Sequence, residues 1–126
     1  MRDESLFDDW IVNEYERTGG FTALVVLVSI ANLGVVPLCS TFTHVIGDEI
    51  DWHHFVMLMS GARIAWDGVM LMPVTDKGGG PVDDMKATAE LRALEERIQA
   101  NRLVINEGHF FDKWGRRMKV ELAQPN

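Results

Sequence analysis

Residues 5–20 carry apolar side chains at the three- and four-residue steps that place them on one face of a helix. The residues on this face are Leu6, Phe7, Trp10, Ile11 and Tyr15. Ser5 stands where the N-cap of such a helix is expected, and Gly19-Gly20 provides a natural end. The pattern therefore predicts a helix over this segment.

The next 26 residues, 21–46, contain no formal charge. Residues 21–39 are apolar enough for a single membrane-spanning helix, which would make this a membrane-anchored protein. The run is rich in Val, Ile and Thr, however, and the turn-like sequence ANLG at 31–34 divides it into residues 21–30 and 35–42. Its flanks also lack the cluster of basic residues that anchors a span. We therefore favour two buried strands and keep the span at 21–39 as an alternative.

Three further elements follow along the chain. Residues 47–62 predict a second helix with Asp48 as its N-cap, and residues 63–74 predict a strand closed by Pro73. Residues 82–100 predict a third helix, because four apolar residues share one face. These residues are Ala87, Leu91, Leu94 and Ile98.

The C-terminal part of the sequence has the pattern of strands and turns. Residues 102–106 and 109–111 are β-like, and in residues 116–123 apolar and charged side chains alternate, as in a half-buried strand. The order of elements is then α-β-β-α-β-α-β-β. A chain of 126 residues fits one domain. We expect a single α+β domain over residues 1–126, a mostly antiparallel sheet packed by three helices.

The net charge of the chain and its distribution along the sequence limit the kinds of molecule that the protein is expected to bind. The net charge is -7, which opposes binding to nucleic acid. Residues 1–100 hold 7 basic and 16 acidic side chains, whereas residues 101–126 hold 5 basic and 3 acidic ones. The single cysteine, Cys39, permits no intrachain disulfide, and the N-terminus lacks the pattern of a signal peptide. We expect a cytoplasmic protein whose only surface suited to anions is C-terminal.

Acidic and histidine side chains concentrate in residues 44–54, and all of them are able to bind a divalent metal ion. They are His44, Asp48, Glu49, Asp51, His53 and His54. Asp51 and His54 lie three residues apart and share a helix face, but two ligands are too few for a site. A metal-dependent enzyme that uses His44, Asp51 and His54 is kept as an alternative. The favoured interpretation has no cofactor.

The sequence GHFFDKWGRRMK, residues 108–119, interleaves aromatic and basic side chains. This composition is typical of the energetically dominant residues of protein interfaces. The predicted contact residues are Phe110, Phe111, Lys113, Trp114, Arg116 and Arg117. We therefore predict a small acidic protein that works without catalysis, by binding another macromolecule. The expected partner is another protein or a second copy of the chain, since short sheets often complete themselves across a dimer.

Overall fold

The charge-free run forms the centre of an antiparallel sheet in the computed structural model, which describes residues 5–31, 34–47 and 49–121. Strand β1 (Phe21–Ala31) pairs with β2 (Gly34–Val45) on one side and with β3 (Gly68–Val74) on the other. Strand β4 (His109–Asp112) pairs with β3. The order across the sheet is β2-β1-β3-β4. Strand β2 therefore lies at one edge and β4 at the other.

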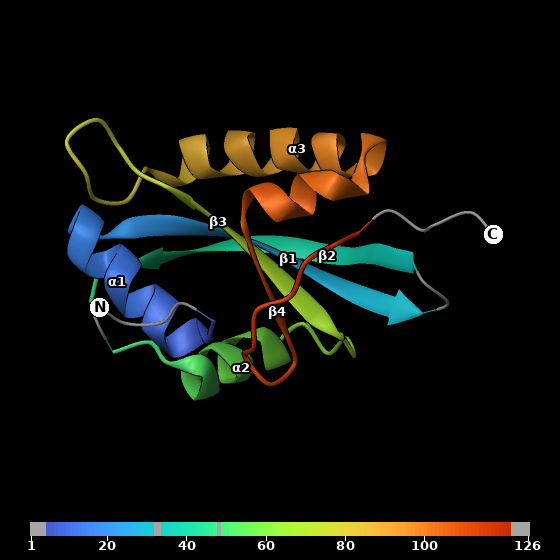
Figure 1. Ribbon diagram of the computed structural model, residues 1–126. Coiled ribbons are helices and arrows are strands. Elements are labelled where there is room, and N and C mark those ends of the chain that lie inside the picture. Colours follow the sequence, from blue (N-terminus) through green and yellow to red (C-terminus); the bar gives the residue numbers. More distant parts are fainter. Residues whose placement is uncertain (1–4, 32–33, 48, 122–126) are drawn as a thin grey trace.

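Helices cover both faces of this sheet (Figure 1). On one face lie α1 (Phe7–Thr18) and α2 (Trp52–Ser60), and on the other lie α3 (Asp84–Ala100) and the short 3₁₀ helix η1 (Arg102–Glu107). Val25 and Leu27 pack toward α1 and α2, whereas Leu24 and Val26 pack toward α3 and η1. Because successive strand residues point to opposite faces, a strand covered on both faces reads as one continuous apolar run.

These layers confirm the expected fold class, a single α+β domain with an antiparallel sheet and the expected order of its main helices and strands. The segment proposed as an alternative membrane span forms β1 and the first half of β2, so it is not a helix. Among the described residues, no helix is both long and apolar enough to cross a membrane.

Three boundaries differ from the sequence-based expectation. The helix after β2 begins at Trp52 with Asp51 as its N-cap, and Asp48 lies outside the described residues. The N-cap of α1 is Leu6, which makes no side-chain cap hydrogen bond, so Ser5 does not fill this position. Residues 63–67 precede β3 as a connection, because pairing with β1 starts only at Gly68.

The prediction of a strand at residues 102–106 is wrong. This segment is η1, which begins where the Asn101 side chain accepts a hydrogen bond from the Leu103 N–H (3.0 Å). Val104 and Ile105 are buried against α3 and the sheet. Packing against a neighbouring helix thus overrides the β propensity of these branched residues.

The segment after Gly115 keeps the predicted alternation without forming a continuous ladder. Met118 and Val120 are partly buried against the core, whereas Lys119 is exposed. The Asn106 side chain donates to the Val120 carbonyl (2.7 Å) and accepts from its N–H (2.8 Å). The Asn106 side chain thus makes the two hydrogen bonds with Val120 that a neighbouring strand would otherwise make. Leu122 lies outside the described residues.

Candidate functional site

Residues 112–117 form a tight turn at the end of β4, called here the tryptophan turn. Asp112 organises it, because its Oδ1 accepts hydrogen bonds from the N–H groups of Trp114 (2.9 Å) and Arg116 (3.0 Å). The Gly115 N–H also donates to the Asp112 carbonyl (3.0 Å). Gly115 has a φ of 79°, a conformation that favours glycine. The turn is therefore held in one shape by the Asp112 carboxylate together with backbone hydrogen bonds.

The tryptophan turn is also fixed to the rest of the molecule. The Phe7 N–H donates to the Gly115 carbonyl (2.8 Å), and the Arg117 N–H donates to the Ser5 carbonyl (2.7 Å). A Cβ on Gly115 would lie only 2.9 Å from the Trp52 ring, so the turn packs closely on the start of α2. Its position is therefore set by contacts with the start of α1 and the start of α2, as well as by its connection to β4.

The Trp114 side chain is the main exposed apolar group of this turn. The residue is 63% exposed. A basic residue precedes it in the sequence and another follows two positions after it, and both lie close to its ring. The Lys113 Nζ is 5.2 Å from the ring centroid and the Arg116 guanidinium carbon is 5.0 Å from it. Both distances are within the range of cation–π attraction. The turn thus exposes to solvent an aromatic ring that has two cationic side chains close to it.

The two arginines of the turn are held differently. Arg116 donates from Nε to Asp112 Oδ2 (2.9 Å), an ion pair within the turn. The Arg117 guanidinium lies over the Phe111 ring, 4.9 Å from its centroid, and its Nη1 is 3.1 Å from Nδ1 of His109. Arg117 thus supports the packing of β4 as well as contributing charge to the surface.

The predicted contact residues do not all lie on the surface. Phe110 is buried against α3 and η1, and Phe111 is buried on the opposite face among the residues of α1 and α2. Both rings are core residues, so the surface that a partner can reach consists of Lys113, Trp114, Arg116 and Arg117. The pattern of residues 108–119 alone does not reveal this, because both faces of β4 are covered by distant helices.

The structure does not bring the three predicted metal ligands together. His44 faces the α3 side of the sheet, where its Nε2 is 2.7 Å from Oδ1 of Asp84. Asp51 and His54 lie at the start of α2, on the other face, with His54 Nδ1 2.8 Å from Asp51 Oδ1. Hydrogen bonds from the His54 backbone and side chain lower the pKa of Asp51. In the described residues, no three acidic, histidine or cysteine side chains are grouped to hold a metal ion.

His44 belongs instead to a hydrogen-bond chain between β1, β2 and the start of α3. Thr22 Oγ1 accepts from the Val82 N–H (3.1 Å) and lies 2.8 Å from Nδ1 of His44. If the Thr22 hydroxyl donates to Nδ1, the neutral ring donates from Nε2 to Asp84, and every group in the chain has a partner. Thr22 is completely buried, so this hydrogen-bond chain joins β1, β2 and the start of α3 from inside the molecule.

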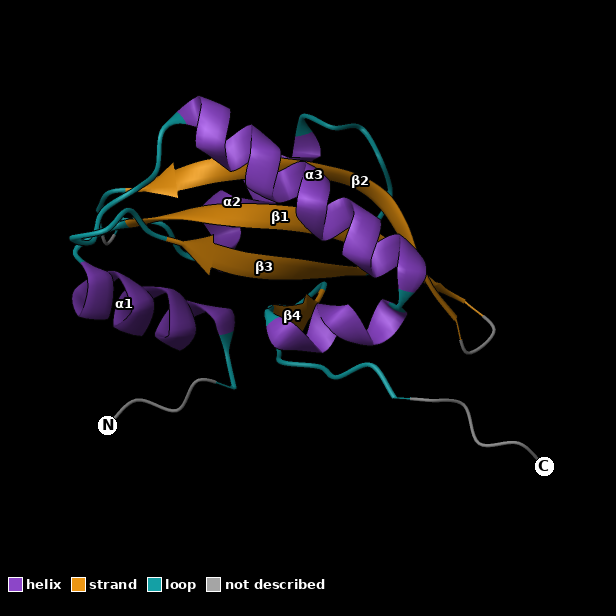
Figure 2. Ribbon diagram, turned by 90° about the horizontal axis from the view of Figure 1, so that it is seen from above, coloured by secondary structure: helices purple, strands orange, loops and turns teal. Residues whose placement is uncertain are grey.

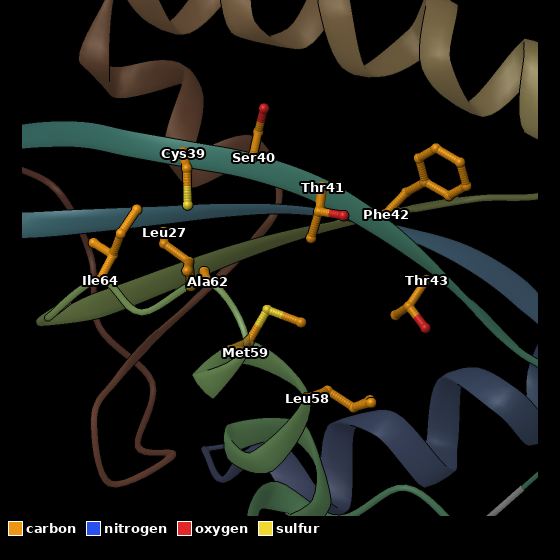
Figure 3. A pocket seen from close by; sticks show the side chains of 10 residues that line it. All are labelled: Leu27, Cys39, Ser40, Thr41, Phe42, Thr43, Leu58, Met59, Ala62 and Ile64. Atoms are coloured by element: carbon orange, nitrogen blue, oxygen red, sulfur yellow. The ribbon is translucent and has the colours of Figure 1, made fainter.

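A groove of about 520 Å³, which the sequence did not predict, lies between β2 and the end of α2. Cys39, Thr41 and Thr43 point into it from β2, while Ser40 and Phe42 point to the other side of the strand (Figure 3). Its other wall comes from α2 and the connection after it, mainly Met59 and Ile64. Burial raises the pKa of the Cys39 thiol, which disfavours the reactive thiolate. The groove is therefore an apolar surface without an activated nucleophile.

Comparisons of this chain with protein-family models, with curated proteins and with solved structures give no match.

Proposed function

We propose that this protein acts by binding another protein through the tryptophan turn, without catalysing a reaction. The observation that carries the proposal is the exposure of Trp114. All four tryptophans are described, and the other three are buried or half-buried. Tryptophan and arginine are enriched among the residues that dominate the free energy of protein binding. An exposed indole with adjacent cations has that chemistry.

The rigidity of the tryptophan turn supports the same proposal. Association costs less conformational entropy when the contact residues already hold their bound shape. Here the hydrogen bonds from Trp114 and Arg116 to Asp112, and those that join the turn to Ser5 and Phe7, fix the backbone before any partner arrives. The backbone of Trp114 is thus held in a defined position.

Charge indicates the kind of protein that this surface fits. The chain carries a net charge of -7, yet Lys113, Arg116 and Arg117 concentrate positive charge around Trp114. A partner segment with carboxylates around an apolar contact would be attracted to this turn and repelled by the rest of the molecule. Such complementarity orients the encounter and favours one register of binding.

The test compares wild-type protein with a Lys113→Ala/Trp114→Ala double variant as immobilised bait in an extract of the source cells. Both residues are exposed, so the variant should remain folded. We expect the capture of a direct partner to fall by about 30-fold, since truncating a central tryptophan costs about 2 kcal/mol. Quantitative mass spectrometry of the captured proteins measures this loss.

The matched control is Met85→Ala/Arg92→Ala, which removes an exposed apolar and a basic side chain from α3. It should leave capture unchanged. A Lys113→Ala/Trp114→Ala protein that unfolds at the same urea concentration as wild type and retains every partner would refute the proposal. For any partner that is found, protection of Trp114 from acrylamide quenching provides a direct second measurement.

A further inference from the structure

The outer edge of β2 is the exposed edge of the sheet. At the opposite edge, β4 is covered by Arg117, the last residue of the tryptophan turn, which forms a bridge with Phe111, and by the next residue, whose Met118 N–H donates to the Phe110 carbonyl (2.7 Å). Over residues 5–31, 34–47 and 49–121, no strand lies beyond β2. An exposed strand edge is a template for pairing with another chain.

The register shows which backbone groups of β2 point outward. The Asp67 N–H donates to the Val28 carbonyl (2.8 Å), so Val28 faces β3. By alternation, Leu27 and Val25 face β2 and pair with Cys39 and Thr41. The β2 residues that alternate with Cys39 and Thr41 therefore direct their backbone N–H and C=O groups away from the sheet. These residues are Ser40, Phe42 and His44.

Only the second half of β2 is open. In the first half, Arg102 donates from Nε to the Val35 carbonyl (3.0 Å), and Pro37 has no N–H to donate. The ladder with β1 also has an irregularity between Leu27 and Val28, opposite residues 37–39. From Cys39 to Val45 the pairing with β1 is regular, and this stretch carries no Asp, Glu, Lys or Arg.

We propose that this half of β2 pairs antiparallel with the same strand of a second copy, forming a two-fold symmetric dimer with one continuous sheet. In antiparallel pairing, residues that lie opposite each other share a face, so a two-fold axis normal to the sheet passes beside one residue. With Thr41 at the axis, Ser40 of each copy exchanges hydrogen bonds with Phe42 of the other. The two Thr41 side chains then lie side by side.

Exposed apolar side chains next to the open edge of β2 would contact a second copy paired there. Met57 and Leu58 of α2 are 61% and 55% exposed, and Ile64 is 39% exposed. Seen from above, part of α2 emerges beyond the edge of β2 (Figure 2). A strand added at β2 would lie over this end of α2 and present its own Cys39, Thr41 and Thr43 face to the groove. The same contacts arise twice, as two-fold symmetry requires.

Charge and area favour a second copy over a different chain. The open half of β2 carries no Asp, Glu, Lys or Arg, so two copies of a chain with net charge -7 can meet there without like charges in the contact. Pairing of about eight residues, with the flanking end of α2, buries on the order of 500 Å² from each copy. The total of about 1,000 Å² reaches the lower limit for a specific interface. We therefore expect a dimer with a micromolar dissociation constant.

Sedimentation velocity of the wild-type chain over a range of concentrations tests the dimer. The chain has a mass of 14.2 kDa, and we expect a concentration-dependent shift from this mass to twice its value. Added salt should strengthen the dimer, because it screens the repulsion between two acidic copies. A single species at the monomer mass up to about 1 mM, a concentration at which even weak dimers form, overturns the proposal.

Charge substitutions at Thr41 test the location and the symmetry of the contact. Thr41→Lys alone and Thr41→Glu alone should each weaken the dimer at least tenfold, because each charge meets its own copy. An equimolar mixture of the two variants should restore dimers, since opposite charges then meet. The controls are Thr88→Lys and Thr88→Glu on the exposed side of α3, which should leave the dimer unchanged. Dimers of undiminished strength with Thr41→Lys alone and Thr41→Glu alone place the contact elsewhere and overturn the proposal.

Amide hydrogen exchange of the wild-type protein gives a test that does not depend on a variant. The outward amides of Ser40, Phe42 and His44 should become protected as the protein concentration rises. Equal exchange at low and high concentration overturns the pairing. The Lys113→Ala/Trp114→Ala variant should dimerise like wild type, so the outcome here is independent of the function proposed for the tryptophan turn.

Discussion

Gly115 is the residue at which the tryptophan turn meets the start of α2. Its φ of 79° suits glycine, and a Cβ there would lie 2.9 Å from the Trp52 ring. Two separate costs therefore attach to any side chain at this position. One is the strain of the left-handed backbone, and the other is the displacement of a packed aromatic ring.

We expect Gly115→Ala to lower the free energy of unfolding by about 2–4 kcal/mol, combining the strain of the left-handed conformation with that of overpacking. Gly19→Ala is the matched control, because Gly19 has a φ of 73° but no atom within 4 Å of its added Cβ. That variant should lose only about 1 kcal/mol. Urea unfolding of both proteins measures the difference, and equal losses would show that Trp52 does not restrict the turn.

For single residues, the sequence predicted chemical character more reliably than burial or exposure. The turn around Asp112 and Gly115 and the exposed charge of Lys113 follow from local residue types. The burial of Phe110 and Phe111 does not, because it depends on α1 and α2 covering one face of the sheet and α3 and η1 covering the other. Neighbouring residues in a strand point to opposite faces, so both rings are buried only when both faces are covered.

Between elements, the clearest connection outside the hydrophobic core is the chain of hydrogen bonds centred on Thr22. Its hydroxyl joins β1 to the backbone just before α3, and through His44 it joins β2 to Asp84. Thr22 and the Val82 N–H are buried, so neither group can turn to water when the other is removed.

Thr22→Val keeps the shape of the side chain but leaves the Val82 N–H and the Nδ1 of His44 without their partner. We expect the free energy of unfolding to fall by about 2–3 kcal/mol, the cost of buried groups that lose their hydrogen bonds. Thr22→Ser retains the hydroxyl and should cost only about 1 kcal/mol for the lost methyl group. Chemical denaturation compares the two variants. A Thr22→Ser protein that loses as much stability as Thr22→Val would contradict this account.

Elements with strong periodicity or continuous burial were the easiest to predict. Burial requires the continuous apolar run of β1 and the helical spacing of apolar residues in α3, so both elements can be predicted from the order of apolar and polar residues. Arg102–Glu107 was misjudged, because its branched residues fit a strand equally well and only the Asn101 cap and the contact with α3 select a 3₁₀ helix. The cluster of acids and histidines also misled, since the sheet separates His44 from Asp51.

For the whole molecule, the central position of β1 implies unequal stability. Residues 21–28 are all buried, and their side chains contribute to the clusters on both faces of the sheet. We therefore expect the amides of residues 21–28 to become accessible only when the entire domain unfolds. Helix α2 is short and buries only Phe55 and Met59, so it can open locally.

Native-state hydrogen exchange should reflect this difference. We expect the amides of Leu24 to Leu27 to exchange with the full free energy of unfolding measured in urea, and those of α2 to exchange several orders of magnitude faster. Spectroscopic resolution of individual amides is sufficient for the comparison. Equal protection of α2 and β1 would mean that the domain opens only as one unit.

The strand order β2-β1-β3-β4 has a consequence for avidity. The proposed pairing uses β2, whereas the tryptophan turn follows β4 at the opposite edge. In the paired form the two turns would thus stand at the two outer ends of an eight-stranded sheet, about 35 Å apart at the spacing of neighbouring strands. A partner with two acidic segments at matching distance would bind the second turn intramolecularly. Weak single contacts would then add to a stable complex, and binding would respond steeply to the concentration of this chain.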